Sequence, residues 1–149
     1  MGFDTEKESS TISNESSSLV SQQNDNSTTE ENTVEKMILQ IGNDTFTSTL
    51  ENNDAVDALV DMMREASVVI QMSDYSGFEK VGSLGTSLPT SNKQTTTQSG
   101  DIVLYNGTQI VIFYGSNSWS YTRLGKIDDL SGWEDALGSG DVTVTFSLE

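Results

Sequence analysis

Apolar and polar residues alternate with a period of two in several short stretches of the chain, a pattern typical of β-strands. Other stretches are short apolar runs rich in Val and Ile, which favour buried strands. The predicted strands cover residues 36–41, 45–50, 67–72, 101–105, 108–114, 119–127 and 141–148. Many short strands within one domain favour a closed barrel, because closure leaves few strand edges exposed.

Turn residues divide these runs. Asn106-Gly107 separates two runs rich in β-branched residues, which predicts a type I′ hairpin with positive φ at both positions. Gly42-Asn43-Asp44 predicts a second hairpin turn near the start of the domain. Residues 73–100 contain only short apolar pieces among glycines and polar residues, so we expect this stretch to be largely irregular.

A different period occurs in one segment. Its apolar residues recur at helical spacing, which predicts an amphipathic helix over residues 54–65. Asp54 and Asp57 fall in its first turn, where the helix dipole favours negative charge. A second, short helix is predicted over residues 130–137, ended by the glycines that follow. The expected fold class is therefore mainly β, a closed eight-stranded barrel with one or two helices.

The N-terminal segment differs in composition from the rest of the chain. Nineteen of its first 34 residues are Ser, Thr, Asn or Gln. So polar a segment cannot bury enough apolar surface to offset the entropy of ordering it. We predict that residues 1–35 form a disordered tail and residues 36–149 form the barrel domain. The tail is either a tether that holds the domain away from a surface or a segment that only aids solubility.

The charge of the chain and the residue types that it lacks exclude several classes of function. The chain has 7 basic and 23 acidic residues and a net charge of −16, which argues against nucleic acids and anionic membranes as partners. It contains no Cys and no His, which excludes thiolate nucleophiles, histidine general bases and the usual zinc sites. No apolar run approaches membrane-spanning length, so we expect no direct membrane insertion. We also expect no cofactor and no bound metal.

Four segments resemble the bacterial cyclophilin-like domain family. They are residues 74–85 (Asp-Tyr-Ser-Gly-Phe-Glu-Lys-Val-Gly-Ser-Leu-Gly), 100–105 (Gly-Asp-Ile-Val-Leu-Tyr), 113–121 (Phe-Tyr-Gly-Ser-Asn-Ser-Trp-Ser-Tyr) and 125–127 (Gly-Lys-Ile). The resemblance implies a cyclophilin-like eight-stranded barrel closed by helices, in a family with no settled activity. It also implies a secreted or lipid-anchored protein outside the cytoplasm, although this chain carries no such signal.

The catalytic cyclophilins, which are peptidyl-prolyl isomerases, are more distantly similar. On that match Gln109 stands at their groove glutamine, and Tyr121 stands at their groove histidine. Their catalytic arginine has no counterpart here, since residues 68–77 contain no arginine. We therefore name no catalytic residue, and a weak isomerase remains an alternative in which Arg123 is the only substitute cation.

A ligand-binding groove is the best candidate site. Its candidate residues are Tyr75, Phe78, Gln109, Phe113, Trp119, Tyr121 and Arg123. Tyr and Trp combine a large contact area with a polar group, which suits a pocket. The two phenylalanines could instead fill the barrel, and Arg123 could form an ordinary surface ion pair.

These observations favour a non-catalytic, cyclophilin-like binding module carried on a flexible tether. Its ligand would be a small molecule or an extended peptide, and we expect a monomer. Two alternatives stay open: a weak peptidyl-prolyl cis-trans isomerase, and a structural or protein-interaction domain.

Overall fold

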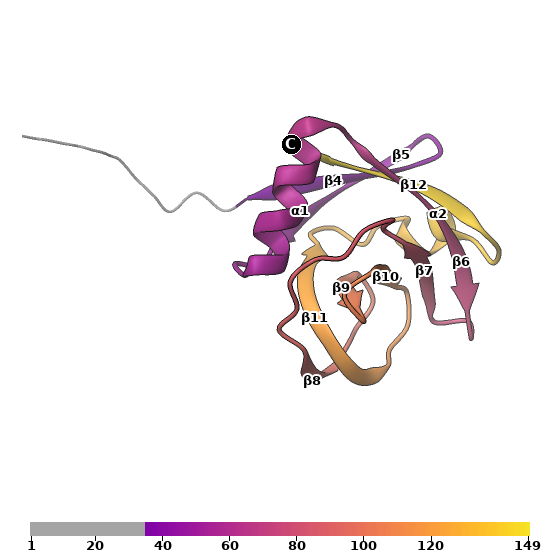
Figure 1. Ribbon diagram of the computed structural model, residues 1–149. Helices are drawn as coiled ribbons and strands as arrows, with labels where there is room; N and C mark the ends of the chain where they lie inside the picture. The colour runs from indigo at the N-terminus through magenta and orange to yellow at the C-terminus, as the bar shows by residue number, and fades with distance from the viewer. Residues whose placement is uncertain (1–34) are drawn as a thin grey trace, which may run out of the picture. The chain divides into compact units, whose positions relative to one another are not determined.

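The computed structural model describes residues 35–149, so the predicted tail lies almost entirely outside the described residues. Over this range the chain forms nine strands and two helices (Figure 1). The elements are β4 (Lys36–Ile41), β5 (Asp44–Leu50), α1 (Asp54–Glu65), β6 (Val68–Tyr75), β7 (Glu79–Ser83), β8 (Lys93–Thr96), β9 (Asp101–Tyr105), β10 (Gln109–Phe113), β11 (Ser118–Ile127), α2 (Trp133–Leu137) and β12 (Val142–Leu148).

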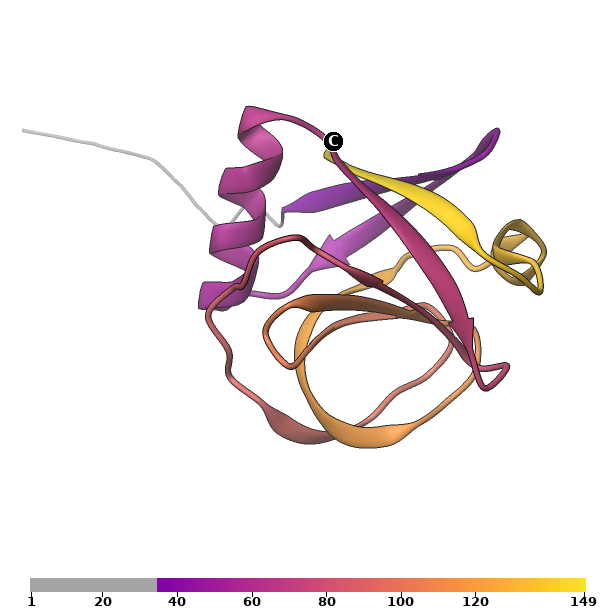
Figure 2. The same ribbon diagram turned by 45° about the vertical axis from the view of Figure 1, so that its right-hand side comes forward.

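Eight of the strands close into an antiparallel barrel in the order β5-β4-β12-β6-β7-β10-β9-β11 (Figure 2). The ring closes where the end of β11 pairs with β5, with Gly125 opposite Leu50. A Cβ atom on Gly125 would lie 2.6 Å from the Thr49 carbonyl oxygen, so this close approach requires glycine. The extra strand, β8, pairs with the first part of β11. The predicted mainly β, closed eight-stranded barrel is confirmed.

The barrel interior is apolar and is covered by the first helix. Inward-facing residues such as Ile110 and Leu124 are buried, and Leu59 of α1 lies among them. Helix α1 begins and ends where its periodicity predicts. Its N-cap residue, Asn53, accepts a hydrogen bond from the Val56 N–H at 2.9 Å. The amide of the same side chain donates to the Arg123 carbonyl at 2.8 Å, which ties the helix start to β11.

The second helix, α2, is short, and it packs on the barrel through two buried residues, Trp133 and Leu137. Trp133 is 1% exposed, and its indole N–H donates to the Phe113 carbonyl at 2.8 Å. The indole also packs edge-to-face on Phe46, with ring centroids 5.0 Å apart. The helix starts three residues later than predicted and ends at Leu137, as predicted, and Gly138 after it has φ of +67°.

The hairpin prediction is confirmed, whereas the expectation of an irregular stretch over 73–100 is wrong. Asn106 and Gly107 have φ of 55° and 74°. The same conformation recurs at Ser76 and Gly77, with φ of 54° and 75°, in the loop that joins β6 to β7. Strands β7 and β8 were missed because they are short and mostly polar, and they are held by neighbours distant in sequence.

Neither helix within residues 35–149 is long and apolar enough to cross a membrane.

Candidate functional site

Strand β7 presents two consecutive charged residues, Glu79 and Lys80, to opposite faces of the barrel wall. Lys80 pairs with Ile112, a residue of the interior core. Glu79 pairs with Phe113, which belongs to a second apolar cluster on the outer face. Because successive side chains of a strand point to opposite faces, Lys80 points into the barrel and Glu79 points to its outer face.

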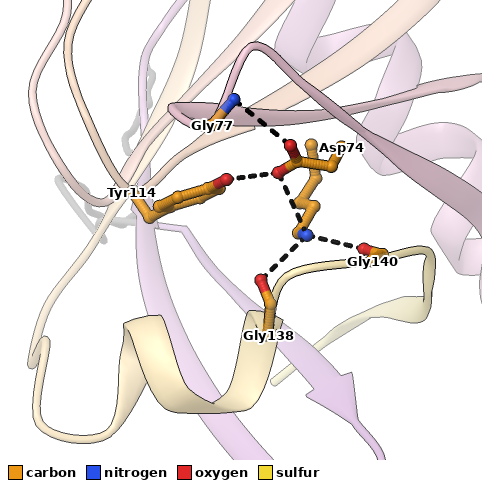
Figure 3. A network of polar contacts seen from close by, with 6 residues as sticks. Asp74, Gly77, Tyr114, Gly138 and Gly140 are labelled. Carbon is orange, nitrogen blue, oxygen red and sulfur yellow. Dashed lines mark hydrogen bonds and ion pairs between the residues drawn. The ribbon is translucent and has the colours of Figure 1, made fainter.

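Lys80 is fully buried, and its ammonium contacts oxygen atoms of Asp74, Gly138 and Gly140, which Figure 3 labels. The Nζ atom donates to the carbonyls of Gly138 and Gly140 at 2.9 Å and 2.6 Å. It also forms an ion pair with Asp74 Oδ1 at 3.2 Å and lies 5.4 Å from the centre of the Tyr114 ring. A buried charge is tolerated only when it is paired and hydrogen-bonded, as Lys80 is here.

Asp74 extends this network to the loop between β6 and β7. The Tyr114 hydroxyl donates to Oδ1, and the Gly77 N–H donates to Oδ2 at 3.2 Å. The hydrogen bond from Tyr114, followed by the contacts with Lys80, lowers the pKa of Asp74 below its usual value. The same bond raises the pKa of Tyr114 to about 12. The network therefore joins the β6–β7 loop to the segment after α2.

The outer face carries its own small apolar cluster. Val103, Val111, Phe113 and Tyr121 are buried there, separately from the barrel interior. The rings of Phe113 and Tyr121 meet edge-to-face, with centroids 5.7 Å apart. Half-buried Tyr105 packs against Tyr121 in the same manner at 6.2 Å. This cluster, contributed by β9, β10 and β11, forms the floor of a groove.

The groove has a volume of about 560 Å³. It is lined by Tyr75, Ser76, Phe78, Glu79, Val81, Tyr105, Gln109, Asn117, Trp119 and Tyr121. Tyr75 and Phe78 stand at the β6–β7 side, with their rings edge-to-face at 5.8 Å. Trp119, on β11, also lines it. Tyr75 and Trp119 are each 56% exposed, which is unusual for large aromatic side chains.

Glu79 is the one charged residue among the described residues that line the groove. Glu79 is 7% exposed, and its Oε1 atom has no hydrogen-bond partner within residues 35–149. Burial, with a smaller contribution from the negative charge of Asp74, raises the pKa of Glu79 to about 7. A buried and unpaired carboxyl group costs stability, and such groups concentrate at functional sites.

The structure brings five of the seven predicted groove residues together in the lining: Tyr75, Phe78, Gln109, Trp119 and Tyr121. Phe113 lies beneath them, fully buried in the floor. The Tyr121 hydroxyl accepts a hydrogen bond from the Asn117 amide at 2.8 Å. Burial raises the pKa of Tyr121 above its usual value, partly offset by that hydrogen bond.

Arg123 does not line the groove. Its guanidinium forms an ion pair with Asp101 at 3.2 Å and donates to the Thr96 carbonyl at 3.3 Å. Alternation along β11 correctly suggests that Tyr121 and Arg123 share a face. However, Asp101 on the neighbouring strand β9 holds the arginine away from the groove. Arg123 is therefore placed as an ion-paired residue, which was the simpler of its two interpretations.

Sequence reasoning missed Glu79, and with it Tyr105. Both fall within segments that carry the family resemblance, yet neither was singled out. A possible signal was the run Phe78-Glu79-Lys80-Val81. If it is taken as a strand, alternation predicts that Glu79 shares a face with Val81. The lack of a partner for Glu79 could not be predicted, because it depends on side chains from other strands.

No group of three carboxylates within residues 35–149 lies close enough together to hold a metal ion.

Residues 39–147 match a family model described as the cyclophilin-like family. The match runs from within β4 to the last residue but one of β12, so it includes at least part of every strand, both helices and the groove. A comparison with curated proteins gave no match.

Replacing Lys80 should destabilise the domain strongly. Lys80→Met keeps the buried stem but leaves two carbonyls and Asp74 without the ammonium, so we expect a loss of about 3 kcal/mol. The exposed Lys126→Met is the matched control, with an expected change within about 0.5 kcal/mol. Urea unfolding followed by tryptophan fluorescence measures both. Equal stability of the two variants would show that the Lys80 network contributes little.

Glu79→Gln should raise stability in a pH-dependent way. The Glu79 pKa is raised from 4.5 to about 7 on folding, so the folded state holds an extra proton between these values. Through Glu79, the free energy of unfolding of the wild-type domain therefore falls as pH rises through this window, and it stays lower above the window. Between about pH 4.5 and 8, the advantage of the variant should grow by on the order of 2 kcal/mol.

Urea unfolding of wild type and variant at the two pH values measures this growth, because the other carboxyl groups cancel in the difference. Glu51→Gln, at an exposed position, removes the same charge and should show no such growth. If Glu79→Gln behaves as Glu51→Gln does, the Glu79 carboxyl group is not desolvated.

Proposed function

The chain belongs to the cyclophilin-like family, and we propose that its barrel is a non-catalytic binding module for a small molecule or an extended peptide. The observation that carries this proposal is the groove of about 560 Å³ on the outer face of the barrel. Ligand sites typically occupy about 300–1,000 Å³ and combine aromatic walls with few polar groups. The volume of the groove falls within this range, and five of its ten lining residues are aromatic.

The exposed aromatic rings support a binding role. Tyr75 and Trp119 lie at the groove, and each leaves more than half of its surface exposed. Exposed aromatic residues that adjoin a concave surface are typical of binding sites, since each ring offers contact area with little loss of conformational freedom. Their cost to solubility is offset by the high negative charge of the chain.

The charge of the groove favours binding over isomerisation. An isomerase must bind the twisted imide more tightly than either planar form, and a cation that stabilises it supplies this difference. Among the described residues of the lining the charged group is Glu79, which is acidic. Arg123 is already paired with Asp101. Gln109 remains as a neutral donor, and one neutral hydrogen bond contributes only about 1 kcal/mol.

Placement of the module is a further part of the proposal. The composition of residues 1–35 supports a tether, and the family resemblance supports display outside the cytoplasm, secreted or lipid-anchored. We propose that the domain acts as a monomer.

A peptide titration tests the function. We expect an Ala-Pro peptide to shift the NMR signals of the Trp119 indole and of Tyr121, without accelerating cis-trans exchange above background. Trp119→Ala should weaken binding several-fold, since stacking is lost while the exposed position leaves the fold intact. A protease-coupled assay or exchange spectroscopy measures the rate.

Two other results would each point elsewhere. Acceleration that disappears in Arg123→Ala would make Arg123 a catalytic group and the protein an isomerase. Binding of a protein partner that is insensitive to every groove substitution would instead favour a structural or protein-interaction domain.

A further inference from the structure

The groove contains a buried acceptor with nothing to accept from. Glu79 is 7% exposed, and its Oε1 atom has no hydrogen-bond partner in the described chain. Lys80, next to it on β7, points to the opposite face and binds other acceptors. Folding therefore leaves one carboxylate oxygen in the groove wall desolvated and unsatisfied. An unmet hydrogen-bonding group of this kind costs free energy, which a ligand with a matching donor would recover.

The surroundings of Glu79 are aromatic or negative. Asp74 and Tyr75 lie near it on β6, Tyr121 faces it from β11, and Phe113 is its partner on β10. Tyr105 of β9 lies beside Tyr121. Lys80, which follows Glu79 in the sequence, is paired with Asp74, and Arg123, which follows Tyr121 by two residues, is paired with Asp101. The site thus offers one carboxylate flanked by the faces and edges of several rings.

We propose that the groove binds an organic cation that carries N–H groups, a primary ammonium or a guanidinium, with Glu79 as the anchor. This inference rests on the proposed binding function and specifies its ligand. The cation would pair with the carboxylate charge, and a rotation of the Glu79 side chain would bring Oε1, which is buried in the free groove, to the donor. The ring faces of the lining, chiefly Tyr75 and Trp119, would hold the rest of the cation through cation–π contacts.

Charge complementarity favours a cation over a neutral donor. The described domain has six basic and sixteen acidic residues, so its field attracts positive ligands. A charged donor also forms a stronger hydrogen bond to a carboxylate than a neutral amide does. A quaternary ammonium would satisfy the rings but could not donate to Oε1. The ligand chemistry is therefore that of an amine or guanidine, either free or on a Lys or Arg side chain.

Binding should depend on pH in one direction. A bound cation favours the charged carboxylate, so binding displaces the proton that Glu79 holds near neutral pH. Affinity should rise as pH increases through about 7 and level off above that range. Asp74 is already charged there because its pKa is lowered, and it adds no step in this window.

Matched probes test the inference. Butylguanidinium and the neutral butylurea have similar shape, and N-acetyl Ala-Arg-Ala amide and its citrulline analogue form the same pair in a peptide. Titrations followed by the Trp119 indole signal and the Glu79 amide signal give affinities. We expect each cation to bind at least about tenfold more tightly than its neutral analogue at about pH 8. Tetramethylammonium should bind weakly.

Two Glu→Gln variants separate the anchor from the general charge. Glu79→Gln should abolish the preference for the cation and its pH dependence, whereas the exposed Glu51→Gln should preserve both. Trp119→Ala should weaken the cations more than their neutral analogues, because it removes a cation–π contact as well as contact area, and it tests the aromatic part of the site independently of Glu79. Tight binding of butylguanidinium with weak binding of the Arg peptide assigns a small-molecule ligand, and the reverse assigns a peptide.

The two proposals fail in different ways. If cations and neutral analogues shift the groove signals equally, and Glu79→Gln changes nothing, the cation inference is overturned while the binding groove stands. If none of the probes shifts these signals, the cation inference also fails. The binding function is then decided by the Ala-Pro peptide titration alone.

Discussion

The buried ammonium of Lys80 is the constraint on which the functional half of the domain depends. Its three oxygen partners come from β6 and from the segment that follows α2, so one charge holds together parts of the chain that are distant in sequence. Asp74 also accepts a hydrogen bond from the Gly77 N–H, which fixes the β6–β7 loop to the same network. Tyr75 ends β6 just before that loop and Phe78 is the last residue of the loop, so the geometry of the groove wall depends on how a buried charge is satisfied.

The pleat of β7 then separates two opposite charges that stand side by side in the sequence. Lys80 turns inward, where carbonyls and a carboxylate satisfy it, and Glu79 turns outward into the groove. The strand cannot bring them together, because consecutive side chains point to opposite faces. The result is one fully paired charge and one unpaired charge, both buried. Burial of the Glu79 carboxylate lowers the stability of the domain, and its position in the groove wall makes it available to a ligand. This arrangement connects the packing of the barrel end with the proposed recognition of a cation.

Local patterns explain what could be predicted from the sequence. Helix α1 and the Asn106-Gly107 turn follow from periodicity and backbone preference within a few residues, and the family resemblance supplied the barrel topology. Aromatic residues of the lining could be named because Tyr and Trp combine a large contact area with a polar group, which suits a pocket. Strands β7 and β8 were missed because pairing with distant strands, not their own composition, makes them strands. The placement of Arg123 against Asp101, and the isolation of Glu79, depend on contacts across the sheet that no local pattern contains.

The most direct test is the ionisation of Glu79 itself, followed through the ¹³C signal of its carboxyl carbon. We expect a midpoint at about 7 in the free domain, against 4.5 for an ordinary glutamate. Saturation with butylguanidinium should lower the midpoint by about one unit or more, because the bound cation stabilises the carboxylate. A midpoint near 4.5 that the cation leaves unchanged would contradict both the desolvated carboxylate and its proposed role as an anchor.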